Sequence, residues 1–284
     1  MSRLSKCTGT LLATVVWLGC LIVPQAGLAK VSCERDPQGS VLSISVTERT
    51  RAIVRRAGDA ITVFEFANPA RGCQAGATIA NTDRIELFAG EDTGVHIELA
   101  KGPFAPGLTP EADGSPEIEF EISGEGLVEV VGPPGPDHYR FTGAGTESGV
   151  NLNPADDEDP DLTVPPEARA GIIFVVSGGA GADRIDALGR PALEMFAVGG
   201  RGDDTLVAAP GGAILGGEAG SDLLIGSPTL DFIVPGKGAD VVRAGGGPDE
   251  VVLNRDGARD RVDCGSGNDF AFGADRLDRL RSCR

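Results

Sequence analysis

A nine-residue repeat runs through the C-terminal part of this 284-residue chain. Residues 178–186 (GGAGADRID) and 199–207 (GGRGDDTLV) both fit the pattern G-G-x-G-x-D-x-U-x, in which U is a large aliphatic residue. One copy of this length cannot bury its aliphatic residue alone, whereas copies stacked on one another can. The repeat therefore predicts an all-β fold in which short strands build a thin, ladder-like core.

Weaker copies continue the pattern toward the C-terminus. The sixth position is held by Asp204, Asp222, Asp231, Asp240 and Asp249, with Ala213 in one eroded copy, and after two extra residues by Asp260, Asp269 and Asp278. An apolar residue follows two positions later: Leu206, Leu215, Leu224, Ile233, Val242, Val251, Val262, Ala271 and Leu280. Both series stay in phase, which predicts that these apolar residues point inward. The glycines allow the positive-φ turns that such tight loops need.

These residues resemble the hemolysin-type calcium-binding repeats, or RTX repeats, over about residues 178–284. The segments 104–120 and 149–153 are also similar to the region that precedes such repeats in uncharacterised secreted actinobacterial proteins. The resemblance implies a right-handed parallel β-solenoid, or β-roll, in which two nonapeptides make one turn, and it implies Ca²⁺ as the ligand. Because the chain has cysteines and an N-terminal signal, the calcium-triggered folding that follows one-step export in many RTX proteins is not expected here.

Two nonapeptides per turn would place loops eighteen residues apart above one another. One edge of the stack, the first edge, would then carry Asp183, Asp204, Asp222, Asp240, Asp260 and Asp278. The opposite, second edge would carry Met195, Ala213, Asp231, Asp249 and Asp269. We expect calcium mainly at the first edge, because the second has lost aspartate at two places and lacks loop glycines around Asp231.

Aspartates and loop glycines of the repeats are the candidate calcium ligands. They are Gly179, Gly181, Asp183, Gly200, Gly202, Asp203, Asp204, Gly220, Asp222, Asp231, Gly236, Gly238, Asp240 and Asp249. Carboxylates on adjacent turns, about 5 Å apart, would repel each other by on the order of 3 kcal/mol. A hard cation that takes carboxylate and carbonyl oxygens would relieve this repulsion, whereas zinc prefers His and Cys. The alternative is a metal-free solenoid with solvated aspartates.

The first 29 residues are typical of a signal peptide. Arg3 and Lys6 precede an apolar run over residues 11–23, and small residues at 27–29 offer a cleavage site. The run is short for a membrane span, so we predict a secreted protein, with association to the cell envelope as an alternative. Residues 17–20 are faintly similar to a lipoprotein cleavage box, but Trp17 is a poor residue for its first position.

Four cysteines remain beyond the signal peptide, and an even number outside the cell suggests disulfides. Proximity in the sequence predicts the pairs Cys33–Cys73 and Cys264–Cys283, one near each end of the mature chain. Free buried thiols are the alternative. The runs 260–263 (DRVD) and 275–278 (DRLD) further suggest a salt-bridged cap at the C-terminal end, closed by Cys264 and Cys283.

The chain divides into a signal peptide (1–29), an N-terminal β region (30–170) and the repeat region (171–284). Alternation of apolar and polar residues predicts strands over 41–46, 61–66, 84–88, 95–99, 117–122 and 127–131. The run 132–135 (GPPG) is typical of a turn. The acidic run 154–161 is typical of a solvated loop, with a calcium-binding loop as the alternative.

The charge of the chain and its motifs limit the classes of function that we expect. An excess of 42 acidic over 25 basic residues disfavours a nucleic-acid partner. His96 and His138 belong to no H-E-x-x-H motif, and the chain has no G-x-S-x-G motif. We therefore expect a non-catalytic, calcium-binding structural or binding module. A surface adhesin for glycans or proteins is the first alternative, and a calcium-dependent polysaccharide lyase is a more remote one.

Overall fold

The structure is a computed structural model that describes residues 30–73, 75–100, 104, 118–144, 147–152, 160–165, 172–187 and 195–284. The predicted signal peptide and most of the acidic run 154–161 lie outside these residues. The described residues form strands and loops with no helix, so the all-β prediction is confirmed. No helix in this part of the chain is long and apolar enough to cross a membrane.

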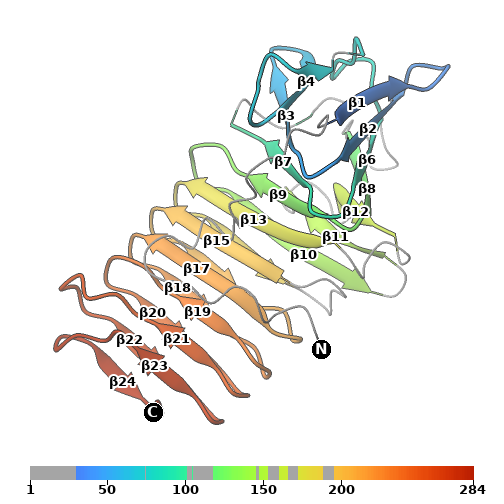
Figure 1. Cartoon of the computed structure of the whole chain (residues 1–284). Coiled ribbons are helices and arrows are strands. Elements are labelled where there is room, and N and C mark those ends of the chain that lie inside the picture. Colours follow the sequence, from blue (N-terminus) through green and yellow to red (C-terminus); the bar gives the residue numbers. More distant parts are fainter. Residues whose placement is uncertain are drawn as a thin grey trace.

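The strands form two sheets (Figure 1). Sheet A has thirteen strands in the order β1 (Lys30–Arg35), β2 (Val41–Thr47), β6 (Arg84–Ala89), β8 (Glu119–Gly124), β12 (Leu162–Val164), β11 (Glu147–Asn151), β10 (His138–Ala144), β14 (Arg184–Ala187), β16 (Thr205–Val207), β18 (Leu223–Ile225), β20 (Val241–Arg243), β22 (Arg261–Asp263) and β24 (Arg279–Arg281). Sheet B has eleven strands in the order β23 (Phe270–Phe272), β21 (Glu250–Val252), β19 (Phe232–Val234), β17 (Ala213–Ala219), β15 (Met195–Arg201), β13 (Ile173–Ala180), β9 (Leu127–Val131), β7 (Gly94–Glu98), β3 (Arg51–Ala57), β4 (Ala60–Glu65) and β5 (Gly72–Cys73).

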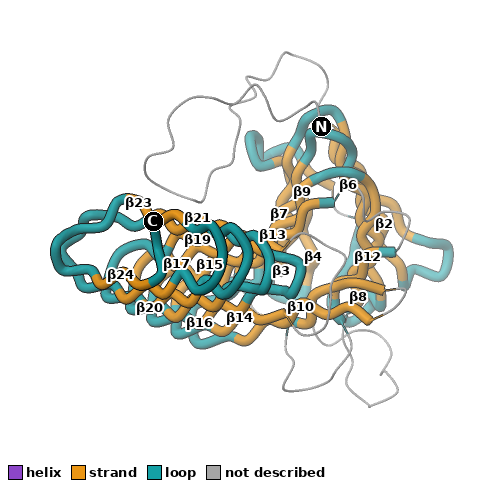
Figure 2. Tube along the Cα trace, turned by 90° about the horizontal axis from the view of Figure 1, so that it is seen from below, coloured by secondary structure: helices purple, strands orange, loops and turns teal. Residues whose placement is uncertain are grey.

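In the C-terminal half the chain alternates between the sheets, one short strand at a time. Strands that neighbour each other in a sheet are parallel and lie two repeats apart in sequence, as Leu206, Leu224 and Val242 do in sheet A. Figure 2 shows the strands of the two sheets on opposite sides of this half. The apolar series of the repeat lies between the sheets and is fully buried from Leu206 to Val262.

Two members of that series depart from the prediction. Ala271 is only partly buried, and Leu280, on the last strand β24, has 43% of its surface exposed. Strand β24 is the edge strand of sheet A, so no further turn covers Leu280. The position that is inward-facing in every earlier turn is therefore open to solvent in the last one.

The described residues between 30 and 165 continue the same two sheets. Strands β2, β6 and β8 are parallel in sheet A, strands β3, β7 and β9 are parallel in sheet B, and β9 pairs directly with β13 of the repeat region. The six strands expected in this region are all present. Antiparallel strands β1, β4 and β5 flank the N-terminal end, while β11 and β12 insert two extra strands into sheet A.

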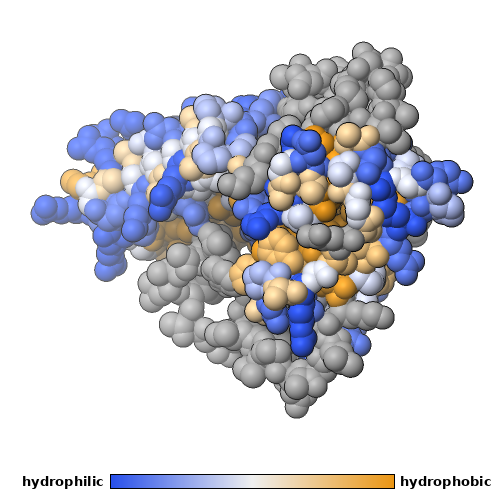
Figure 3. All heavy atoms as spheres, turned by 90° about the horizontal axis from the view of Figure 1, so that it is seen from above, coloured by the Kyte–Doolittle hydropathy of each residue, from blue (hydrophilic) through white to orange (hydrophobic). Residues whose placement is uncertain are grey.

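Both predicted disulfides are formed, which is compatible with an extracellular protein. Cys33 of β1 is bonded to Cys73 of β5, and Cys264 is bonded to Cys283 near the C-terminus. The expected salt-bridged cap is reduced to one ion pair in the described residues 255–284, between Arg281 and Asp263 at 3.6 Å. The C-terminal end is therefore closed by the disulfide rather than by a network of charges. Seen from above, the C-terminal half of the protein presents mainly hydrophilic residues, whereas hydrophobic residues gather over the N-terminal strands (Figure 3).

Candidate metal centre

The aspartates of the first edge form a hydrogen-bonded file through the stack. One carboxylate oxygen, Oδ1, of each aspartate accepts a hydrogen bond from the backbone N–H of the aspartate one turn earlier. The donor and acceptor pairs are Asp183 to Asp204 (2.7 Å), Asp204 to Asp222 (2.8 Å), Asp222 to Asp240 (2.8 Å), Asp240 to Asp260 (3.0 Å) and Asp260 to Asp278 (3.1 Å). We call this set the first aspartate file. The edge membership that the eighteen-residue spacing predicted is confirmed.

The file begins one turn earlier than the sequence pattern suggested. The backbone N–H of Asp137 donates to Oδ1 of Asp183 at 2.8 Å, and the backbone of Gly135 pairs with that of Ala180. Residues 132–140 (GPPGPDHYR) are in fact a degenerate repeat, with Tyr139 as the buried inward residue. GPPG was predicted only as a turn, although the spacing G-x-x-G-x-D would have revealed the site. Asp137 and Asp183 are 46 positions apart, and the segment between them includes strands β11 and β12, which obscure the period.

The second carboxylate oxygen, Oδ2, accepts no hydrogen bond from the described residues along most of the file. Oδ2 is buried and has no hydrogen-bond partner among the described residues at Asp137, Asp183, Asp204, Asp222 and Asp240. Buried polar atoms in proteins are almost always paired, because an unmade hydrogen bond costs about 1 to 3 kcal/mol and more for a charged group. A row of such oxygens on one edge is suited to bind cations.

Glycine at the first position of three of these loops makes room for this carboxylate. A Cβ atom at Gly178, Gly199 or Gly217 would lie 2.3–2.4 Å from Oδ2 of the aspartate five residues later. None of the three has a positive φ, so the requirement is for space and not for backbone conformation. The glycines predicted from the sequence as ligands hold only the second and fourth positions of the loops, so this first position was missed.

Gly199→Ala is therefore expected to destabilise the protein and to weaken cation binding together. The new methyl group would lie 2.3 Å from Oδ2 and 2.8 Å from Cβ of Asp204, so the carboxylate would have to move. We expect a loss of about 1 to 3 kcal/mol in unfolding free energy, as is common for overpacking. Urea unfolding with and without calcium measures both effects.

Gly211→Ala is the matched control, because nothing lies within 4 Å of a Cβ at Gly211 and its φ is not positive. It should change stability by less than about 0.5 kcal/mol. Equal losses in the two variants would show that the first-position glycine does not accommodate the carboxylate.

The glycines that were predicted as ligands lie in the loops of the first edge and bring successive turns together. Gly181, Gly202, Gly220 and Gly238 stack so closely that a Cβ would meet the carbonyl oxygen of the glycine one turn earlier at 2.0 Å or less. Gly179, Gly200 and Gly236 have positive φ. These residues contribute backbone carbonyls to the loops.

Asp203 is separate from the file: its exposed side chain accepts a hydrogen bond from the backbone N–H of Ser221 at 2.7 Å.

The second edge carries a shorter file with the same ladder. Oδ1 of Asp231, Asp249 and Asp269 accepts from the backbone N–H of Ala213, Asp231 and Asp249 respectively. Asp231 differs from the first file, because its Oδ2 accepts a second hydrogen bond from the backbone N–H of Ser227 at 2.6 Å. Only Asp249 and Asp269 leave a buried Oδ2 without a partner among the described residues.

Burial changes the acidity of both files. It raises the pKa of Asp222 and Asp240 to about 7, and the pKa of Asp137, Asp204, Asp249 and Asp260 to about 6. Neighbouring aspartates add to the effect, as Asp240 and Asp204 do for Asp222. Each group can therefore take up a proton, or a cation in its place, near neutral pH.

The donor set limits which cation fits. No three His, Cys, Asp or Glu side chains come together as a metal-binding group in the part of the chain that the structure describes. Side chains from the files would thus need backbone carbonyl oxygens to complete a coordination shell. The two histidines lie elsewhere, His96 beside Glu129 and His138 beside Asp186, each at 3.1 Å. An oxygen-only set with several carbonyls fits Ca²⁺ and does not fit zinc.

Comparison with known proteins adds no family to this description. No protein-family model matches the chain, and no curated protein matches its sequence significantly. The similarity to hemolysin-type repeats therefore rests on the nine-residue pattern.

Proposed function

We propose that this protein is a secreted, non-catalytic calcium-binding module whose parallel strands form an RTX-like, right-handed β-solenoid. The observation that carries the proposal is the row of buried Oδ2 atoms that have no partner within the described part of the chain, at Asp137, Asp183, Asp204, Asp222 and Asp240. Alternation of the chain between two parallel sheets, with a step of two repeats, supports the solenoid architecture. Calcium would act as a structural ligand that holds the loops of successive turns together.

Calcium suits these carboxylates better than protons do in an extracellular setting. A carboxyl whose pKa is about 6 is mostly ionised above pH 7, and then its buried Oδ2 carries charge with no hydrogen bond. A dissociation constant of about 0.1 mM is typical of extracellular calcium modules. At ~1 mM free calcium, each such site would stabilise the folded state by about 1.4 kcal/mol.

The first edge is proposed as the main calcium-binding edge. Five of its aspartates have a buried Oδ2 without a partner among the described residues, compared with two at the second edge. At Asp231 the hydrogen bond from Ser227 already satisfies Oδ2. Of the predicted ligands, Asp231 is thus the weakest candidate.

Calcium titration tests the proposal directly. We expect the melting temperature of the disulfide-bonded protein without residues 1–29 to rise by about 10 °C or more at ~1 mM calcium, from several sites acting together. Equal concentrations of magnesium should give a smaller rise, because magnesium demands a stricter geometry and keeps its water. Calorimetry in chelator and in calcium provides the measurement. An identical melting temperature and identical sedimentation in both conditions would contradict the proposal.

The lyase alternative has less support. His138, Arg140 and Arg184 do converge, but they converge on the buried carboxylate of Asp186, at 3.1, 3.4 and 2.7 Å. One carboxylate thus accepts hydrogen bonds from all three basic side chains, and this neutralises part of the charge that an acidic sugar would need. We interpret the cluster as a link between strands β10 and β14.

A further inference from the structure

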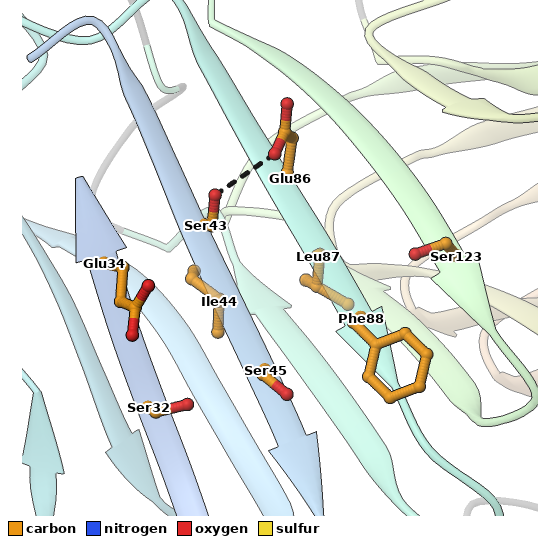
Figure 4. Close-up of a pocket in the computed structure, with 9 residues that line it drawn as sticks. All are labelled: Ser32, Glu34, Ser43, Ile44, Ser45, Glu86, Leu87, Phe88 and Ser123. Atoms are coloured by element: carbon orange, nitrogen blue, oxygen red, sulfur yellow. Dashed lines mark hydrogen bonds between the residues drawn. The ribbon is translucent and has the colours of Figure 1, made fainter. Parts of the chain in front are cut away.

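A shallow groove of about 330 Å³ crosses the outer face of the N-terminal strands of sheet A (Figure 4). Its walls come from β1, β2, β6 and β8, and the lining residues are Ser32, Glu34, Ser43, Ile44, Ser45, Glu86, Leu87, Phe88 and Ser123. The volume is at the lower end of the range for small-ligand sites. This groove lies on strands that do not contribute to either aspartate file.

Strand register arranges the outward side chains in two rows. In the first row Ser45 pairs with Ser32 on one side and Phe88 on the other, and Phe88 pairs with Ser123. In the second row Ser43 pairs with Glu34 and with Glu86. Each row crosses strands spaced about 4.8 Å apart, and the rows are roughly 7 Å apart along the strands.

Small side chains create the hollow. Serine is not a typical strand residue, yet it occupies four outward positions here. Ile44 and Leu87, between the rows, point inward and are almost fully buried, so they leave backbone at the floor of the groove. Phe88 stands above this floor with 44% of its surface exposed, which is unusual for a large apolar side chain among serines.

Polar contacts hold the second row in place. Ser43 Oγ donates a hydrogen bond to Glu86 Oε2 at 3.1 Å (Figure 4). The other carboxylate oxygen of Glu86 accepts a hydrogen bond from the Arg84 guanidinium at 3.1 Å. Glu86 is thus held by Ser43 and paired with Arg84 at a half-exposed position, and its oxygens keep lone pairs for further donors. The residues that line the groove include two carboxylates and no basic side chain.

We propose that this groove binds a neutral saccharide. The apolar face of a sugar ring would lie on Phe88, while its hydroxyl groups would donate to Glu34 and Glu86 and exchange hydrogen bonds with the serines. Anionic sugars and phosphate groups would be repelled by Glu34, which has no cationic partner among the described residues, and the ion pair of Glu86 with Arg84 disfavours a simple cation site. The first row, roughly 14 Å long across four strands, has room for one or two sugar units beside the ring of Phe88.

Affinity electrophoresis of the calcium-loaded protein in gels that contain polysaccharide tests this proposal. The probes are a neutral β-glucan, a mannan and an arabinogalactan, with anionic polygalacturonate for comparison. We expect at least one neutral polymer, and not polygalacturonate, to retard the protein. Phe88→Ala, and Ser45→Arg which fills the groove, should each weaken retardation about tenfold, whereas Phe88→Tyr should preserve it.

Phe270→Ala is the matched control, since Phe270 is equally exposed, at 43%, but lies on β23 at the far end of sheet B. It should bind like the unmodified protein, and unchanged melting temperatures will show that all variants are folded. No retardation by any neutral polymer, or retardation that survives both groove variants, would overturn the proposal. Neither result would bear on calcium binding, because the groove and the aspartate files use different strands.

Discussion

Asp222→Asn is expected to remove at least the contribution of one calcium site, about 1.4 kcal/mol at ~1 mM calcium, from the stabilisation by calcium. Asparagine can still accept the hydrogen bond from the backbone N–H of Asp204, which Oδ1 of Asp222 accepts at 2.8 Å. What it loses is the charge and the second oxygen, which has no partner among the described residues. In chelator the variant should melt close to the unmodified protein, because a buried carboxylate with a pKa near 7 has been removed.

Asp231→Asn should instead lower the stability of the protein without changing its stabilisation by calcium. Both oxygens of Asp231 accept backbone N–H groups, from Ala213 at 2.7 Å and Ser227 at 2.6 Å. An amide would present its NH₂ group to one of these donors and leave a buried N–H unpaired, at about 1 to 3 kcal/mol. The loss should be equal with and without calcium, so the increment due to calcium stays unchanged.

Differential scanning calorimetry of the two variants, each in calcium and in chelator, measures the contrast. Both aspartates are buried, and Oδ1 of each accepts a backbone N–H of the preceding turn. A difference between the variants therefore distinguishes a calcium ligand from an aspartate with a structural role only. If the two variants lose the same part of the calcium increment, the assignment of calcium to the first edge is wrong.

The metal-free protein is expected to become less stable as pH rises, by an amount equivalent to about 10 °C or more in melting temperature between pH 5 and pH 8. Six buried or partly buried aspartates have a pKa of about 6 or 7 in the folded protein, against 3.8 for an exposed carboxyl. The folded state therefore binds more protons than the unfolded state over this window. The stability that these groups contribute is complete below about pH 4 and is lost as pH rises through the raised pKa values. Between pH 5 and pH 8 each group loses on the order of 3 kcal/mol at most.

Calcium should remove most of this pH dependence above pH 7, because the cation replaces the protons that the carboxylates lose. Below pH 6 protons compete with calcium, so the calcium increment should shrink. Melting temperatures from pH 4 to pH 8, in chelator and in calcium, test both statements. A metal-free protein whose stability increases from pH 5 to pH 8 would show that the buried carboxylates are compensated in some other way.

Much of the repeat region follows from local pattern. The nine-residue spacing predicted which residues point inward and which aspartates share an edge, and proximity in the sequence predicted which cysteines pair. These features are predictable because the period-two alternation of a strand and the positions of loop glycines are properties of neighbouring residues. The pattern wrongly predicted that Leu280 is buried. Leu280 lies on the last turn of the stack, and an inward position is buried only if another turn follows.

Other features depend on contacts between distant residues. Asp137 joins the first aspartate file across an insertion that hides the period, and one hydrogen bond from Ser227 makes Asp231 the weakest of the candidate ligands. The groove beside Phe88 exists because four strands pair in one particular register. Pairing partners and register are set by the packing of the whole sheet, so a local sequence pattern cannot specify them.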